Sequence, residues 1–215
     1  MKKTALLSLL AAATLFSAFT AGTTTDSTAA ATEAVLPAKG TPYTVELDKS
    51  ELKWRASKVV GEHYGTIKLS SGQMTVDKNK VTGGSFVMNM ASIECTDNAK
   101  VGAHLRNDDF FSVEKHPTAT FVIKSLKPVA KAEAGKPNYT VEGDLTIKGI
   151  TNPISFPAIV TVKDGIATAK ADVTVNRVKY DIRYRSSSFF ENLGDKAIND
   201  DFTVSLDVTA KQSNI

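Results

Sequence analysis

The stretch from Leu105 to Phe121, LRNDDFFSVEKHPTATF, gathers the side chains best suited to acid–base chemistry. A histidine oriented by a carboxylate can act as a general base, and here two aspartates lie between His104 and His116. No serine in a strand-to-helix elbow and no cysteine beside a histidine supplies the nucleophile that such a base would activate. The segment therefore favours catalysis only weakly.

The histidines and the cysteine show no recognisable metal motif. His63, His104 and His116 lie far apart in the sequence, and no two of them have the spacing of zinc ligands on a helix. Cys95 is the only cysteine, which excludes an internal disulfide and a cysteine-rich zinc module. The sequence thus predicts no metal site and no cofactor, and it predicts that Cys95 is an inert core residue.

Composition and charge exclude another class of function. The chain has 215 residues, 42% of them hydrophobic, which is enough for one domain or a tight pair with a real core. The formal net charge is +3, but Lys2 and Lys3 supply two of these charges within a segment expected to be lost, which leaves +1. With no basic face, nucleic-acid binding is not expected.

Residues 1–22, MKKTALLSLLAAATLFSAFTAG, are typical of an export signal, because two lysines precede an apolar run that is short for a membrane span. The end of this segment resembles the approach to a bacterial lipoprotein cleavage site, but Phe19 stands where the lipidated cysteine would be. Cleavage after Ala18, Ala21 or Gly22, retention of the signal, and loss of a lipoprotein cysteine all stay open.

The rest of the chain divides into a tether and a strand-rich domain. Residues 23–41 are rich in Thr, Ala and Ser and have no periodic apolar face, so we expect a disordered tether. Residues 42–215 alternate apolar and polar side chains with period two, and the turn signals SSGQ, DKNK, TGG, EAGKPN and KDG interrupt the pattern. Eight to ten short strands with tight connections indicate an antiparallel sandwich or barrel.

One segment breaks the period of two. Asp97 is a suitable N-cap, and Ala99, Val101 and Leu105 follow at helical spacing. We therefore expect a helix of two or three turns between the strands, leading directly into the stretch LRNDDFFSVEKHPTATF.

A structural role explains this stretch better than catalysis does. One of the two aspartates, Asp108 or Asp109, can cap a turn, and Phe110 and Phe111 can insert beneath it. Pro117 keeps the preceding histidine extended as the next strand begins. The segment would then cover one end of the barrel.

Three ordered motifs identify a family. HLRNDDFFSVEKHPTATF, YTVEGDLTIKGITNPISF and GDKAINDDFTVSLDVTA resemble the YceI-like family of exported, lipocalin-resembling polyisoprenoid-binding proteins. The resemblance runs through most of Tyr43 to Lys211. It implies an all-β fold, an antiparallel lipocalin-like barrel of about eight strands with one short helix, and an elongated apolar cavity for a long isoprenoid chain. The segment from Asn176 to Gly194 departs from the pattern of many relatives, so its residues are the least transferable.

Alternation places bulky residues on the inward faces of some strands and the small residues Ala167, Ala169 and Ala171 on the inward face of another. Small residues opposite large ones indicate either a filled, tapering interior or empty space along one wall. The resemblance favours space. The predicted apolar lining consists of Trp54, Phe86, Met88, Phe110, Phe111, Phe121, Ile123, Leu145, Ile147, Phe156 and Phe202. The predicted polar rim, which would meet a phosphate or quinone oxygen of a lipid head, consists of His63, His104, Arg106 and Arg183.

The sequence therefore predicts an exported, non-catalytic protein of the periplasm or cell envelope that carries or sequesters a long isoprenoid lipid. The sequence is compatible with peripheral membrane association and with a homodimer, and the oligomeric state stays open. Two alternatives remain. One is an envelope enzyme that acts on a hydrophobic substrate in the same cavity, and the other is a ligand-free structural or stress-associated protein with a solid core.

Overall fold

The computed structural model describes residues 40–213, so the predicted signal segment and nearly all of the predicted tether lie outside the described residues. The strands are β1 (Thr41–Val45), β2 (Glu51–Lys58), β3 (Glu62–Asp77), β4 (Lys80–Cys95), β5 (Thr118–Pro128), β6 (Tyr139–Ile147), β7 (Ile150–Lys163), β8 (Ile166–Asn176) and β9 (Ile198–Gln212). The helical segments are η1 (Leu47–Lys49), α1 (Ala99–Leu105), η2 (Arg177–Tyr180) and η3 (Gly194–Lys196). Within the described residues, none of these helices has the length and apolarity needed to cross a bilayer.

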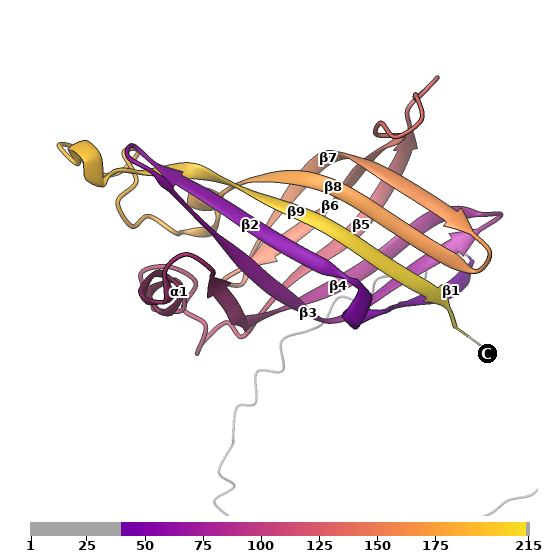
Figure 1. Ribbon diagram of the computed structural model, residues 1–215, viewed down its shortest axis with the longest axis horizontal. Helices are drawn as coiled ribbons and strands as arrows, with labels where there is room; N and C mark the ends of the chain where they lie inside the picture. Colours follow the sequence, from indigo (N-terminus) through magenta and orange to yellow (C-terminus); the bar gives the residue numbers. More distant parts are fainter. Residues whose placement is uncertain (1–39, 214–215) are drawn as a thin grey trace, which may run out of the picture. The chain divides into compact units, whose positions relative to one another are not determined.

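The strands form one closed antiparallel barrel (Figure 1). The order β3-β2-β9-β8-β7-β6-β5-β4 closes on itself because β3 also pairs with β4. β1 pairs with β3 and β9 beyond the end of β2, so β1 and β2 share one of the eight positions, with η1 between them. This confirms the predicted antiparallel barrel of about eight strands with one short helix.

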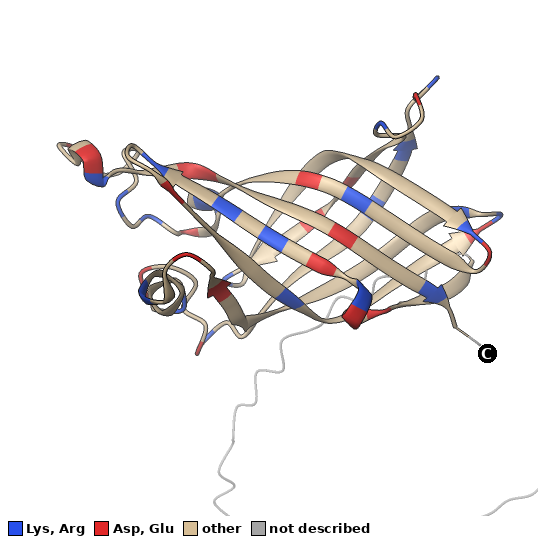
Figure 2. Ribbon diagram, in the orientation of Figure 1, with Lys and Arg blue, Asp and Glu red and all other residues tan. Residues whose placement is uncertain are grey.

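The period of two in the sequence corresponds to the two faces of the barrel wall. Alternate residues of β6 are buried, and so are those of the central part of β4. Acidic and basic residues lie along the outward face, where Figure 2 shows them interspersed on β2, β8 and β9. Most of the inward face belongs to one large hydrophobic cluster, and Trp54, Ile93 and Cys95 form a second, smaller one. The burial of the apolar side chains therefore sets which face of each strand points inward.

Three hairpins close with two-residue turns in which both residues have positive φ. These are Lys78 and Asn79 (48° and 59°), Lys148 and Gly149 (52° and 73°), and Asp164 and Gly165 (49° and 75°). Such turns match the right-handed twist of the flanking strands. The turn signals DKNK and KDG are therefore confirmed.

The turns predicted at SSGQ and TGG are wrong, because both sequences lie inside the long strands β3 and β4. Their glycines serve close approach of strands instead. A Cβ atom at Gly72 would lie 2.7 Å from Cγ2 of Val45, and one at Gly84 would lie 2.7 Å from the carbonyl oxygen of Gln73. A glycine in a strand can mark such an approach as well as a turn.

Two local predictions at element ends are also wrong. The N-cap of α1 is Asn98, whose side chain accepts hydrogen bonds from the backbone N–H groups of Lys100 and Val101, and not Asp97. Tyr43, Val45 and Leu47 alternate with polar residues in the sequence, which predicts that all three face inward, but Leu47 lies in η1 and is exposed. In both cases a shift of one or two residues moves the side chain to a different environment.

The stretch after α1 covers one end of the barrel, as expected. Phe110 is buried in the core cluster and Phe111 packs against it. Asp108 holds the turn below them, because it accepts hydrogen bonds from Oγ of Ser112 at 2.5 Å and from Nζ of Lys115 at 2.8 Å. These contacts hold the paired phenylalanines over the barrel interior.

Tyr180 in η2 offers a test of packing at this end of the barrel. Its ring is 1% exposed, its hydroxyl has no hydrogen-bond partner among the described residues, and burial raises its pKa to about 12. A buried polar group without a partner costs roughly 1–3 kcal/mol, so Tyr180→Phe should raise the free energy of unfolding by about 1 kcal/mol. Urea denaturation measures this, with the exposed Tyr64→Phe as the control. A loss of stability would contradict the packing described.

Candidate functional site

The barrel encloses a cavity of about 210 Å³. Every strand except β1 contributes to its lining, and so do the cover residues Leu105, Phe110 and Phe111. Among the described residues that line it, only Arg177 and Asn199 are polar. The interior is therefore an apolar space with polar groups at a single place.

All of the residues predicted to line the cavity do line it. They are Trp54, Phe86, Met88, Phe110, Phe111, Phe121, Ile123, Leu145, Ile147, Phe156 and Phe202. In the alanine row, Ala169 lines the cavity, whereas Ala167 is fully buried in the core cluster and Ala171 packs against that cluster. Space thus lies along part of this wall, and the contact of each residue with a ligand stays a prediction.

The cavity is long and narrow. Its lining on β4 runs from Val81 to Ile93, which at roughly 3.3 Å per residue and a strand tilt of about 40° corresponds to about 30 Å along the barrel axis. Its volume lies below the roughly 300–1,000 Å³ of common ligand pockets. Met74, Met88 and Met90 line it, and unbranched methionine side chains can move aside for a long guest.

The predicted polar rim is not part of the lining. His63 and His104 each bond an aspartate: Nδ1 of His63 lies 2.7 Å from Oδ2 of Asp97, and Nε2 of His104 lies 2.6 Å from Oδ2 of Asp109. The ring of His104 also stands edge-on to Phe110, with 5.0 Å between ring centroids. Neither imidazole lines the cavity.

The two predicted rim arginines also have partners within the protein. Nη1 of Arg106 donates to the backbone carbonyl of Ile93 at 2.7 Å, and Nε of Arg183 pairs with Oδ1 of Asp181 at 2.7 Å. The guanidinium of Arg183 also lies over the ring of Phe189, 4.6 Å from its centroid. Neither arginine lines the cavity, so a head group held by the four predicted residues is not what the geometry favours.

Arg177 is the charged residue that sequence analysis missed. Its side chain is 5% exposed, and burial lowers the pKa of its guanidinium from the ordinary value. Nε donates to the carbonyl of Asn199, and Nη2 lies 3.3 Å from Oδ1 of Asp200 as an ion pair without hydrogen-bond geometry. The remaining donors bond three backbone carbonyls at 2.9–3.0 Å, those of Ile182, Tyr184 and Ile198.

Arg177 therefore ties the segment after η2 to the start of β9, and its donors are already used within the protein. Asn199, the other polar lining residue, donates from Nδ2 to Oγ of Ser57 at 2.8 Å. The alternation of β8 contained the signal for Arg177, because Val173 and Val175 face inward and the next residue of that series is Arg177.

Comparisons with known proteins agree with this architecture. A family model described as the YceI-like domain matches residues 43–210. A UPF0312 protein of Ectopseudomonas mendocina (strain ymp) is 35% identical over 97 residues, which is 44% of this chain and 48% of that protein. The chain spans about half the length of this and other curated relatives that it matches.

Two solved structures share the fold. BcnA of Burkholderia cenocepacia aligns with a TM-score of 0.63 at 21% identity, covering 78% of this chain and 99% of that one. A polyisoprenoid-binding domain from Saccharophagus degradans, implicated in plant cell wall breakdown, aligns with a TM-score of 0.59 at 13% identity, covering 80% and 98%. At these identities the likeness establishes the barrel architecture.

Proposed function

Because this chain belongs to the YceI-like family, we propose that it binds a long isoprenoid lipid in the barrel cavity, outside the cytoplasm, and carries or sequesters it without a catalytic step. The solved polyisoprenoid-binding domain with the same fold supports the choice of ligand class. The apolar run that follows Lys2 and Lys3 supports export.

The observation that carries this proposal is the composition of the cavity wall. Of its two polar members, Arg177 uses its donors within the protein, and Asn199 donates from Nδ2 to Ser57. A guest inside the barrel would therefore be recognised by its shape and its apolar area. A flexible hydrocarbon tail fits a wall of this kind, and a small polar substrate does not.

The energetics set a minimum length for the tail. Removing tail carbons from water contributes roughly 0.8 kcal/mol each, and association costs at least about 4 kcal/mol. Micromolar binding requires a net of about 8 kcal/mol, so about fifteen buried carbons are needed. An isoprenoid of three or more units meets this requirement, and shorter tails do not.

An enzyme in the same barrel is the second candidate, because the structure contains a histidine–carboxylate pair of the kind that general bases use. That pair, His104 and Asp109, is 36% and 41% exposed at the side chain and does not line the cavity. A base placed there would act on a group outside the apolar space. The geometry therefore favours binding over turnover.

The direct test is native mass spectrometry of protein purified from its own cell envelope without detergent exchange. We expect an added mass that stays with the folded chain and passes into organic solvent on extraction, with an isoprenoid fragmentation pattern. The matched control is protein refolded after solvent extraction, which should lack the added mass and regain it from a polyprenol suspension. A bare chain in both preparations would support the ligand-free alternative and overturn the proposal.

A further inference from the structure

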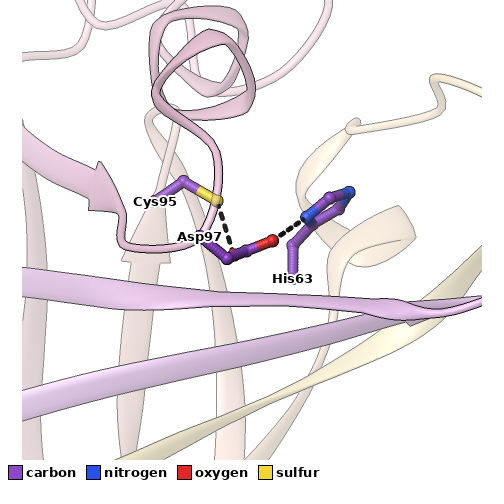
Figure 3. Close-up of side chains that lie close together, drawn as sticks. All are labelled: His63, Cys95 and Asp97. Carbon is purple, nitrogen blue, oxygen red and sulfur yellow. Dashed lines mark hydrogen bonds and ion pairs between the residues drawn. The ribbon is translucent and has the colours of Figure 1, made fainter.

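A cluster of metal-ligating side chains lies outside the cavity wall. It consists of His63 in β3, Cys95 at the end of β4 and Asp97 just before α1. Oδ2 of Asp97 lies 2.7 Å from Nδ1 of His63, Oδ1 lies 3.2 Å from Sγ of Cys95, and one ligand atom from each residue lies within 4.8 Å of the others (Figure 3). None of the three lines the cavity.

The long β3–β4 hairpin brings these residues together although His63 and Cys95 are far apart in sequence. Gly65 is opposite Cys95, and the backbone N–H of Thr96 donates to the carbonyl of Tyr64 at 2.9 Å. A Cβ atom at Gly102 of α1 would lie 2.9 Å from the backbone nitrogen of Cys95, so glycine allows the helix to pack onto the strand end. The position of Cys95 is thus held from two sides.

The order of the three groups excludes a cysteine nucleophile with a histidine base. In such a site the imidazole lies next to the thiol, whereas here the carboxylate of Asp97 lies between Cys95 and His63, as Figure 3 shows. The same three ligands suit a metal ion.

We propose that His63, Cys95 and Asp97 form a binding site for one divalent transition-metal ion of the zinc type, with the fourth position open to water. An imidazole, a thiolate and a carboxylate form a ligand set that suits zinc and not magnesium or calcium. Cys95 is buried, and the side chains of His63 and Asp97 are 26% and 27% exposed, so the ion has access from the solvent side.

The geometry needs only a small adjustment. A tetrahedral zinc ion with bonds of about 2.0 to 2.3 Å holds its ligand atoms about 3.3–3.6 Å apart. The separation of 2.7 Å between Nδ1 of His63 and Oδ2 of Asp97 would have to widen by less than about 1 Å. The most distant pair of ligand atoms, at most 4.8 Å apart, would have to approach by up to about 1.5 Å. On binding, the thiol proton of Cys95 leaves to solvent, and the Nδ1 proton of His63 is replaced by one on Nε2.

The bond pattern without metal is consistent with this assignment. Asp97 bonds both of the other ligands, through Oδ2 to Nδ1 of His63 and through Oδ1 to Sγ of Cys95. The backbone N–H of Tyr64 also donates to Oδ1 of Asp97, at 3.2 Å, which fixes the orientation of the carboxylate. Such outer contacts keep a ligand oriented before the ion arrives.

Titration of the chelator-treated, full-length protein with Co²⁺ tests the site. We expect a thiolate-to-cobalt charge-transfer band that saturates at one equivalent and disappears when Zn²⁺ is added. Because Cys95 is the only cysteine in the chain, the band reports this site alone. Cys95→Ser should abolish the band, and His63→Gln and Asp97→Asn should each weaken Co²⁺ binding about tenfold or more.

His104→Gln is the matched control, because it removes the imidazole of a histidine–aspartate pair that has no thiol beside it. This variant should bind Co²⁺ like the unaltered protein. Circular dichroism checks the fold of each variant. If Cys95→Ser does not fold, the variants at His63 and Asp97, which are less buried, still test the site. Absence of the band in the unaltered protein, or equal binding by His63→Gln and Asp97→Asn, would overturn the proposal. Neither result bears on lipid binding.

Discussion

Replacing Ala169 by Trp should reduce the affinity for a long polyprenol about 50- to 1,000-fold. Ala169 lines the cavity between Val160 of β7 and Val208 of β9, so an indole at this position occupies space that the tail needs. Displacing about three to five tail carbons costs roughly 0.8 kcal/mol each, which corresponds to this range. Equilibrium partition of a tritiated polyprenol between protein and vesicles measures the change.

Thr174→Trp on the same strand is the control, because Thr174 is exposed on the outer face of β8 and should leave the affinity unchanged. Stability adds a second criterion. In a filled core the larger side chain would cost about 1 to 3 kcal/mol or more, whereas a hollow barrel should accept it with a smaller loss. Unchanged polyprenol binding by Ala169→Trp would mean that the tail does not occupy this part of the cavity.

The second large effect concerns Arg177. Arg177→Met should lower the free energy of unfolding by about 3–5 kcal/mol, because the change leaves the partly buried carboxylate of Asp200 without its ion pair. The change also removes the hydrogen-bond donor of backbone carbonyls at both ends of the segment between η2 and β9, including those of Ile182 and Ile198. Urea denaturation followed by circular dichroism gives the global value.

Arg183→Met is the matched control in the same segment. Arg183 is 57% exposed and pairs with Asp181 at the surface, where ion pairs contribute at most about 1 kcal/mol. Native-state hydrogen exchange of residues 182–199 gives a local measure, and these amides should exchange faster in Arg177→Met alone. A loss of stability no larger than that of Arg183→Met would contradict the role assigned to Arg177.

The inward face of the barrel could be predicted because it depends on a local rule. In a strand, each side chain faces opposite to its neighbour, so the positions of Phe86, Met88 and Phe121 follow from the alternation alone. The same rule extends to Arg177, which the sequence analysis did not include among the inward residues. The family motifs then decided between a filled core and a hollow one.

Polar contacts between elements could not be predicted in the same way. Whether His63 meets Asp97 depends on the β3–β4 register, and this register has irregularities between Thr66 and Lys68 and between Leu69 and Ser71. The spacing of residues in the sequence does not reveal these register shifts. The spacing of the histidines accordingly indicated no metal site, although His63 lies beside the carboxylate of Asp97, which also bonds Cys95.

Trp54 lies where its fluorescence can report ligand binding in the cavity. Its Nε1 donates to the carbonyl of Glu94 at 3.0 Å, and its ring is both buried and part of the cavity wall. Since the chain contains a single tryptophan, the indole fluorescence arises from one fixed point beside the apolar space. Quenching by a brominated or polyene-bearing tail would then follow filling and emptying of the barrel in real time, with no label attached.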